Sequence, residues 1–202
     1  LIFYNYLNAQ DEKITEELVS YPTYYFGDPN PLPAFVFNPK IYPYHKFQGY
    51  EFEKINKKFK IVTLENKWIE VQVFPEVGGK VWGATDKSNG NEFIYKNDVA
   101  KFRNIAMRGP WTSGGIEFNF GIIGHHPGTG TPVDYRLDKR SDGSMMCTVG
   151  GIDLPSRTQW RVKIILPKDQ SAFTTRALWY NPSETEQAYY NWMTAAAVAE
   201  ED

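Results

Sequence analysis

The chain has 202 residues, which is enough for one domain with a sizeable hydrophobic core. Its net charge of −2 gives no electrostatic argument for binding nucleic acid or an anionic membrane surface. A single cysteine, Cys147, excludes an intramolecular disulfide and a cysteine zinc cluster. Aromatic residues make up 16% of the chain; they form strands and stack on sugar faces, although a β-rich core alone would also account for them.

The first nine residues are largely apolar as far as Leu7 and are predicted to be a signal-peptide remnant. Leu7 and Ala9 suit cleavage by signal peptidase before Gln10. The segment is too short to span a bilayer. We therefore expect an exported protein, periplasmic or at the cell surface, without membrane insertion. The alternative is that residues 1–9 form an ordinary buried first strand.

Residues 10–50 are predicted to form an arm rich in aromatic residues and proline. Within it, the charged residues 10–20 suggest a short helical or linker turn. The prolines between residues 21 and 43 exclude a helix and a central strand. The aromatic residues among them argue against disorder. We expect an extended arm that lies over the face of the main domain.

Residues 51–202 alternate short strand patterns with turn residues. In residues 68–74, Ile69, Val71 and Val73 share one face of a half-buried strand, and residues 65–67 predict a hairpin loop before it. Further strands are expected at 59–64, 80–85, 92–95, 133–136, 145–149, 158–166, 172–180 and 187–194. This pattern predicts an all-β antiparallel sandwich. We expect it to be incomplete at the C-terminus, where no turn closes the sequence.

Residues 108–127 concentrate glycine, proline and polar side chains that could line a pocket. In a strand, Glu117 and Asn119 would project together to a surface, while Ile116, Phe118 and Phe120 would share the opposite face. A carboxylate and an amide are a suitable pair for sugar hydroxyls. Aromatic neighbours favour the neutral form of a carboxylic acid, as a general acid requires. We therefore predict Glu117 as the acid; a structural pairing of Glu117 with Arg108 is the alternative.

Two adjacent histidines follow this strand. His125 lies in a glycine-flanked loop and is predicted to be a second catalytic residue, with His126 and Arg108 in substrate binding. Neighbouring histidines in extended backbone point to opposite faces, so we predict no metal site and no cofactor. Trp111 and Trp192 are predicted to stack on substrate. Two further aromatic side chains stay open between roles: Trp160 as a platform or a core residue, and His45 as arm packing or a pocket rim.

Three motifs are familiar: residues 73–82, residues 108–121, and Gly124-His125. They resemble a bacterial domain of unknown function whose members are typically exported. Such members are similar to galactose mutarotases in fold and often carry tetratricopeptide repeats after the domain. The resemblance implies a β-supersandwich that binds carbohydrate at its concave face, with Arg108 and His125 in the places of the substrate-binding Arg and His of galactose mutarotases.

The same resemblance separates this chain from an ordinary mutarotase. The segment comparable to the one with the general-acid histidine is residues 189–194, which contain no histidine. The glutamate base of galactose mutarotases lies beyond residue 202. We therefore expect a carbohydrate-binding or carbohydrate-processing protein that acts on a glycan or oligosaccharide, as a glycoside hydrolase or in an aldose-epimerase-like way. The alternative is a non-catalytic module that binds sugar or protein, with protein partners recruited by C-terminal repeats.

Overall fold

The computed structural model describes residues 12–35, 42–106, 109–121 and 124–199, and nearly all of its regular structure is β. The all-β prediction with antiparallel sheets is confirmed. The longer strands are β1 (Lys13–Phe26), β2 (Tyr50–Glu65), β3 (Ile69–Phe74), β4 (Lys80–Asp86), β9 (Ile116–Gly121), β10 (Asp134–Lys139), β11 (Met145–Asp153), β12 (Thr158–Leu166), β13 (Thr174–Tyr180) and β14 (Tyr190–Ala195). The shorter elements are β5 (Glu92–Ile94), β6 (Ala100–Lys101), β7 (Arg103–Asn104), β8 (Pro110–Trp111) and the 3-10 turns η1 (Pro33–Phe35) and η2 (Pro127–Gly130).

The larger sheet has the strand order β14-β9-β4-β3-β2-β1-β6, with β5 paired to β4. Its first strand, β1, corrects the prediction of a helical or linker turn over residues 10–20. Of these, residues 13–20 pair antiparallel with β2 in continuous register, from Lys13 opposite Glu65 onward. Their charged composition is not typical of a strand, but pairing with β2 stabilises one here. Strand formation depends more on context than on intrinsic propensity. Pro22 is accommodated because β1 has a second neighbour, β6, only at Thr23 and Tyr24.

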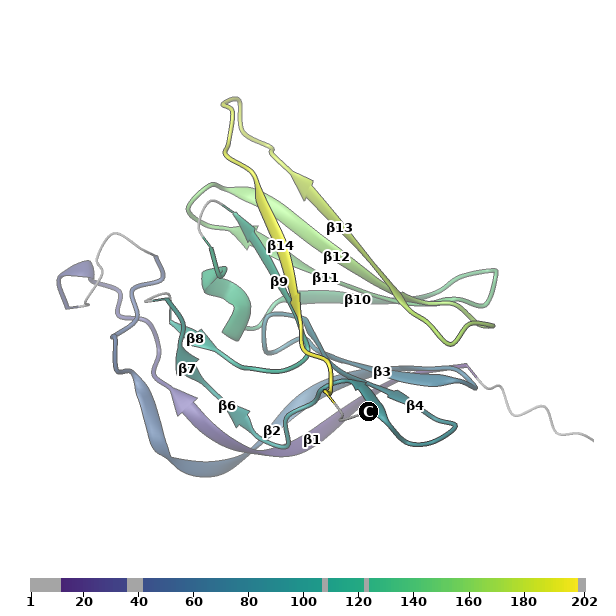
Figure 1. Cartoon of the computed structure of the whole chain (residues 1–202). Helices are drawn as coiled ribbons and strands as arrows, with labels where there is room; N and C mark the ends of the chain where they lie inside the picture. Colours follow the sequence, from purple (N-terminus) through teal and green to yellow (C-terminus); the bar gives the residue numbers. More distant parts are fainter. Residues whose placement is uncertain (1–11, 36–41, 107–108, 122–123, 200–202) are drawn as a thin grey trace, which may run out of the picture.

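The smaller sheet, in the order β10-β11-β12-β13, packs face to face on the larger one (Figure 1). Side chains from both sheets interdigitate in one core, as expected for a β-sandwich. The predicted inner face of β3 is confirmed, because Ile69, Val71 and Val73 are all buried in this core. Opposite them, β12 contributes Val162 and Ile164. The predicted hairpin loop is also confirmed, since β2 ends at Glu65 and β3 begins at Ile69.

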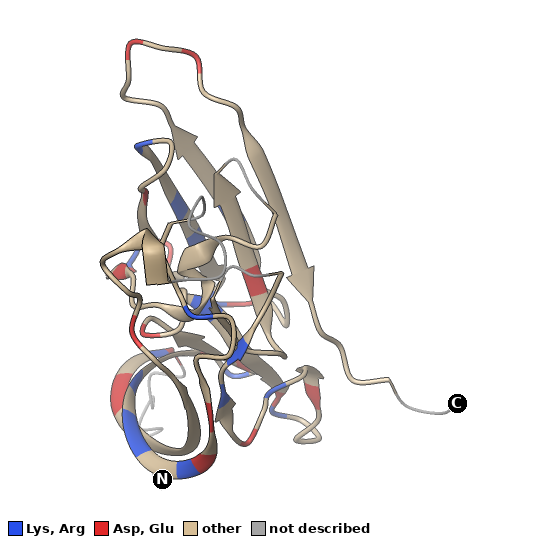
Figure 2. Ribbon diagram, turned by 90° about the vertical axis from the view of Figure 1, so that its left-hand side faces the viewer, with Lys and Arg blue, Asp and Glu red and all other residues tan. Residues whose placement is uncertain are grey.

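The long strands β1 and β2 curl away from this sandwich and enclose a second cluster. Its buried members are Phe26, Phe59, Ile61, Phe74, Val77, Trp82, Ala100 and Phe102. Basic and acidic residues follow one another along the curl (Figure 2), and most residues of the first half of β2 are exposed. The larger sheet therefore buries apolar side chains on both of its faces.

Strand β9 is the element that positions the candidate site. It lies between β4 and β14, and all six of its residues are buried. It reaches β4 through one register pair, Val81 with Ile116, and pairs with β14 from Gly121 to Ile116. None of the helical segments in the described ranges has the length and apolar character that crossing a membrane requires.

Candidate functional site

The two faces of β9 divide its side chains as the sequence predicts, but the polar face is not an open surface. Phe118 and Phe120 enter the core between the sheets, with Phe120 stacked on Trp160 at 4.9 Å between ring centroids. Trp160 is thereby a core residue. Glu117 and Asn119 are 5% and 0% exposed, which corrects the expectation that they project to the surface. Residues 124–130, which could not be placed over the strand from sequence alone, contact both side chains.

Glu117 is held by two aromatic residues through its two carboxylate oxygens. The indole Nε1–H of Trp111 donates to Oε2, and the ring Nδ1–H of His125 donates to Oε1 at 2.9 Å. Because a carboxylate accepts hydrogen bonds, this contact assigns the proton of His125 to Nδ1. Trp111, predicted as a stacking platform, is half-buried and its polar atom is directed at Glu117.

His125 presents its other ring nitrogen away from this contact. Within the described residues, Nε2 has no hydrogen-bond partner, and the side chain is 22% exposed. The ring lies edge-on to Trp192, with 4.9 Å between centroids, and 6.5 Å from the ring of Trp111. Trp192 itself is 40% exposed. The structure therefore brings Glu117, His125, Trp111 and Trp192 into one cluster, which we call the Glu117 cluster.

A buried lysine that the sequence analysis did not assign belongs beside this cluster. Lys80 lies at the start of β4, and its Nζ donates to the Thr112 carbonyl at 2.9 Å and to the Ser113 carbonyl at 3.4 Å. Burial lowers the pKa of Lys80 to about 8, although the nearby charge of Glu117 acts in the opposite direction. Lys80 thus fixes the segment before β9 to β4. The sequence feature that could have indicated a buried lysine is its position between Gly79 and the apolar pair Val81 and Trp82.

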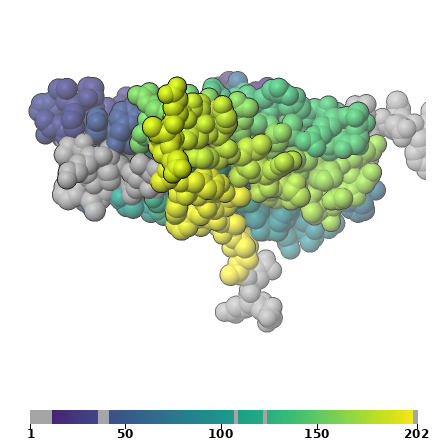
Figure 3. All heavy atoms as spheres, turned by 90° about the horizontal axis from the view of Figure 1, so that it is seen from above, coloured from purple at the N-terminus to yellow at the C-terminus, as the bar shows by residue number. Residues whose placement is uncertain are grey.

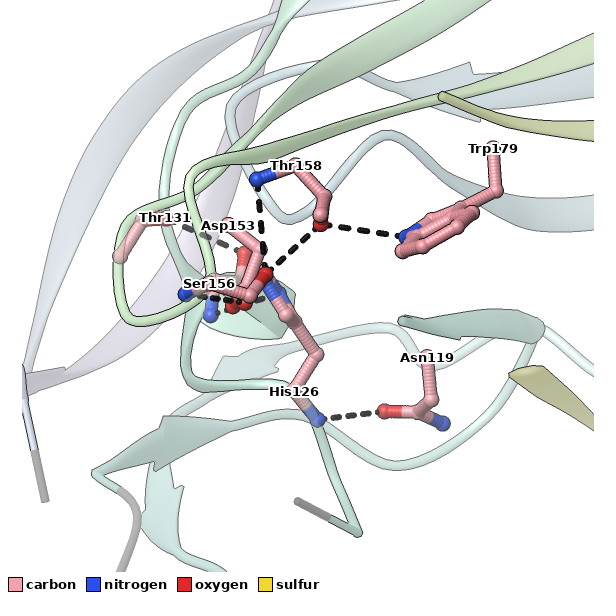
Figure 4. A network of polar contacts seen from close by, with 8 residues as sticks. Asn119, His126, Thr131, Asp153, Ser156, Thr158 and Trp179 are labelled. Atoms are coloured by element: carbon pink, nitrogen blue, oxygen red, sulfur yellow. Dashed lines mark hydrogen bonds and ion pairs between the residues drawn. The ribbon is translucent and has the colours of Figure 1, made fainter. Parts of the chain in front are cut away.

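His126 takes part in a different network of polar contacts (Figure 4). Its backbone N–H donates to Asn119 Oδ1 at 2.7 Å, and its ring Nδ1 accepts from the Gly128 N–H at 3.0 Å. The proton is therefore on Nε2, which faces Asp153 Oδ1 at 3.4 Å. Asp153 also accepts from the hydroxyl and the N–H of Ser156. Each polar atom of this ring is used within the fold.

Asp153 carries the charge of that network. Burial alone would raise its pKa, but the hydrogen bonds from His126 and Ser156 outweigh burial and hold the pKa below its ordinary value. Gly121 leaves room for the carboxylate: a Cβ at this residue would lie 2.9 Å from the carboxyl group, and its φ is +99°. Although serine, histidine and aspartate meet here, the serine hydroxyl is bonded to aspartate and not to histidine. The arrangement is therefore not that of a serine nucleophile.

The remaining predicted residues have separate outcomes. Arg108 lies outside the described residues. Asn119 accepts from His126 through Oδ1, whereas its buried Nδ2 has no hydrogen-bond partner among the described residues. Figure 4 shows this amide nitrogen turned away from His126. Asn119 thus keeps a donor on the same strand face as Glu117.

His45 connects the segment after η1 to this region. Its ring packs edge-on against Phe26 at 5.5 Å between centroids, and burial lowers its pKa. It also lines a small cavity of about 230 Å³ together with His126 and Asp153. Both roles left open by the sequence, packing and the rim of a pocket, therefore hold for His45.

Comparison with known proteins gives two findings. The model of a family described as Domain of unknown function (DUF5107) matches residues 37–202. The crystal structure of a TPR-domain containing protein from Parabacteroides distasonis is 28% identical in sequence and superposes with a TM-score of 0.83. The similarity covers 93% of this chain and 32% of that chain, so this chain spans about a third of that protein.

Proposed function

The chain belongs to the family described as Domain of unknown function (DUF5107), and from its own residues we propose that it binds a glycan or oligosaccharide at the Glu117 cluster. The observation that carries this proposal is the pairing of an oriented imidazole with a partly exposed indole. His125 is fixed through Nδ1 by Glu117, and Trp192 lies edge-on beside it. Hydrogen-bonding groups next to an aromatic face match the polar rim and apolar face of a pyranose.

Each residue has a distinct part in this proposal. Trp192 stacks on a sugar ring, and His125 Nε2 accepts a hydrogen bond from a hydroxyl. The amide Nδ2 of Asn119 is buried without a hydrogen-bond partner among the described residues, which costs about 1–3 kcal/mol. A ligand that displaces the residues covering Asn119 would recover this cost by accepting a hydrogen bond from Nδ2. Trp111 and Lys80 hold the carboxylate and the backbone around it. His126 acts indirectly, by placing the loop that carries His125.

Turnover of the sugar is the second candidate function, and the contact between Glu117 and His125 favours it. A carboxylate that fixes the tautomer of an imidazole leaves Nε2 able to take and return a proton. In this candidate function the Glu117 carboxylate orients His125, and His125 Nε2 takes up the proton as a base and returns it as an acid. Glu117, predicted from the sequence as the acid, would act here through His125.

The setting of the site is also part of the proposal. A galactose mutarotase-like supersandwich, an exported location and tetratricopeptide repeats elsewhere in the protein are consistent with the sequence motifs. The similar Parabacteroides distasonis protein is described as TPR-domain containing. In that setting the domain recognises carbohydrate and repeats recruit protein partners.

Binding of the chain to a broad panel of neutral oligosaccharides tests the proposal. Trp192→Ala is expected to weaken the best ligand by about tenfold or more, since stacking area is lost. Trp68→Ala is the matched control: Trp68 is 41% exposed, similar to Trp192, but lies in the turn between β2 and β3. Absence of binding and of turnover over the whole panel would contradict the carbohydrate proposal.

Catalysis is tested separately by Glu117→Gln, which keeps the shape of the side chain. This variant is expected to lose turnover of any hydrolysed or epimerised sugar while it still binds that sugar. Unchanged turnover would exclude a catalytic role for Glu117.

A further inference from the structure

The outer face of the smaller sheet carries a row of cationic side chains that the proposed function does not use. Strand register places Arg136, Thr148, Lys163 and Arg176 opposite one another across β10, β11, β12 and β13. Directly opposed residues of neighbouring strands share a face and lie about 5 Å apart. The side chains of Arg136 and Arg176 are exposed, and that of Lys163 is half-buried. Three of the four positions in this row are therefore positively charged.

The next row of the same face adds another cation beside a glycine. Asp134, Gly150, Arg161 and Leu178 are opposed across the same four strands. Gly150 has no side chain to fill the face, and the stem of Arg161 lies over it, with Cγ 2.9 Å from where a Cβ would be. The Trp160 carbonyl oxygen of β12 is closer still, at 2.5 Å, so the glycine is explained by the close approach of that neighbouring backbone.

Few anions balance these cations. The face carries four cations, at residues 136, 161, 163 and 176, and two carboxylates, at residues 134 and 138. Arg136 forms an ion pair with Asp138 at 2.8 Å, and Lys163 lies close enough to that carboxylate to help lower its pKa, after the larger effect of Arg136. In the described part of the chain, Arg161 and Arg176 have no ion-pair partner. Directly opposed like charges such as Lys163 and Arg176 destabilise a sheet, so this row is not explained by folding.

The face is also hollowed. A trough of about 570 Å³ runs over it, lined by Arg136, Thr148, Gly150, Gln159, Arg161 and Lys163 among others. Strands β10 to β13 form much of the surface in Figure 3, with β14 in yellow at one side. The trough is open and is lined by hydrogen-bonding groups, by cations and by the carboxylate of Asp134, which suits a ligand with both hydroxyl and anionic groups.

From these observations we propose that the outer face of the smaller sheet binds an acidic polysaccharide, one with carboxylate or sulfate groups along its chain. The anionic character follows from the cation rows alone, whereas the choice of a saccharide rests on the proposed function. Arg161, Lys163 and Arg176 pair with the anionic groups. Thr148 and Gln159, both partly exposed, bond to hydroxyls. This surface lies on the sheet opposite to β9, so the protein has two separate carbohydrate contacts.

Binding of polygalacturonate and of dextran sulfate to the whole chain, by calorimetry at low and moderate salt, tests this proposal. The triple variant Arg161→Gln/Lys163→Gln/Arg176→Gln is expected to lose about tenfold or more in affinity for whichever polymer binds, with a weaker dependence on salt. The control replaces Lys54, Lys58 and Lys67, three exposed lysines on β2 and the loop after it, by glutamine. This control has the same net charge as the triple variant, and it is expected to bind the polymer with the affinity of the unmodified chain.

Three results would overturn the proposal. An equal loss of affinity in the control variant would show that the polymer is attracted by net charge alone. Binding of neither polymer would exclude acidic polysaccharides as ligands. Equally tight binding of poly-glutamate would assign the face to acidic proteins. The test is independent of the Glu117 cluster, because Trp192→Ala is expected to leave polygalacturonate and dextran sulfate binding unchanged. Loss of neutral glycan binding therefore identifies failure at one surface without implying failure at the other.

Discussion

His125 and His126 are neighbours in the chain and lie in two different environments. His126 is buried, and its ring nitrogens and its backbone N–H are all used by Gly128, Asp153 and Asn119. His125 is partly exposed and uses one ring nitrogen, on Glu117. A side chain with all of its hydrogen bonds inside the fold stabilises structure, whereas one that keeps a polar atom accessible is available to a ligand. The contrast indicates a structural role for His126 and supports the proposed role of His125 in ligand recognition.

The largest effect on this contrast is expected from Asp153→Ala. It leaves the ring of His126 and the hydroxyl of Ser156 buried without their acceptor, so the free energy of unfolding should fall by about 3–4 kcal/mol. Denaturant unfolding followed by tryptophan fluorescence measures the change. Asp134→Ala, at an exposed residue, is the control and should change stability little. If the free energy of unfolding of Asp153→Ala falls by less than about 1 kcal/mol, this network does not have the structural role that we assign to it.

Lys80→Met examines the buried cation beside the Glu117 cluster. Lys80 has a folded pKa of about 8 and an ordinary value of 10.5, so its folded-state pKa is depressed. The stability it contributes is fully present above pH 10.5 and is lost as the pH falls through 8. The difference in unfolding free energy between the chain and the variant should therefore change by about 3 kcal/mol between these pH values. If the difference in unfolding free energy does not vary with pH, the depressed pKa of Lys80 is contradicted. Lys54→Met, at an exposed lysine, is the control and should show no such pH dependence.

Gly121→Ala should disturb the His126 side without touching His125. The added Cβ meets the Asp153 carboxyl group at 2.9 Å, and alanine is strained at a φ of +99°. We expect a loss of about 2 kcal/mol in the free energy of unfolding. Gly90→Ala separates the two causes, because Gly90 also has positive φ, +79°, but a Cβ there would meet no atom within 4 Å. Equal losses in both variants would attribute the whole effect to backbone strain.

The smallest effect on stability is expected from His125→Gln. The residue is partly exposed and makes one hydrogen bond with Glu117, so the free energy of unfolding should fall by about 1 kcal/mol or less. Neutral glycan binding should nevertheless weaken. A variant that unfolds much more easily, or that binds as before, would place His125 with His126 as a structural residue.

Sequence patterns predicted the strands well where alternation is strong. Ile69, Val71 and Val73 have their predicted face because period-two alternation describes a half-buried strand directly. The prediction for residues 13–20 was wrong because the charged residues Lys13, Glu16 and Glu17 interrupt any apolar alternation there, and the pairing with β2 decides their structure.

The candidate site was predictable in its residues and not in its contacts. The shared face of Glu117 and Asn119 follows from strand geometry. Their burial does not, because the cover comes from the loop at 124–130 and from β14, whose Trp192 is opposite Asn119. The partner of His126 could not be read either, since Asp153 lies at the end of a strand from the other sheet.

The position of β9 has a consequence for local opening of the molecule. One register pair joins it to β4, whereas six join it to β14, from Tyr190 to Ala195. Strand β14 is at the edge of its sheet, and most of its residues are exposed. A segment with few buried contacts opens at a lower free energy than the core, and its amide hydrogens exchange sooner with solvent. Opening of β14 would remove the part of the cover over Asn119 and Glu117 that this strand supplies, so access to the buried polar face depends on the local stability of an exposed edge strand.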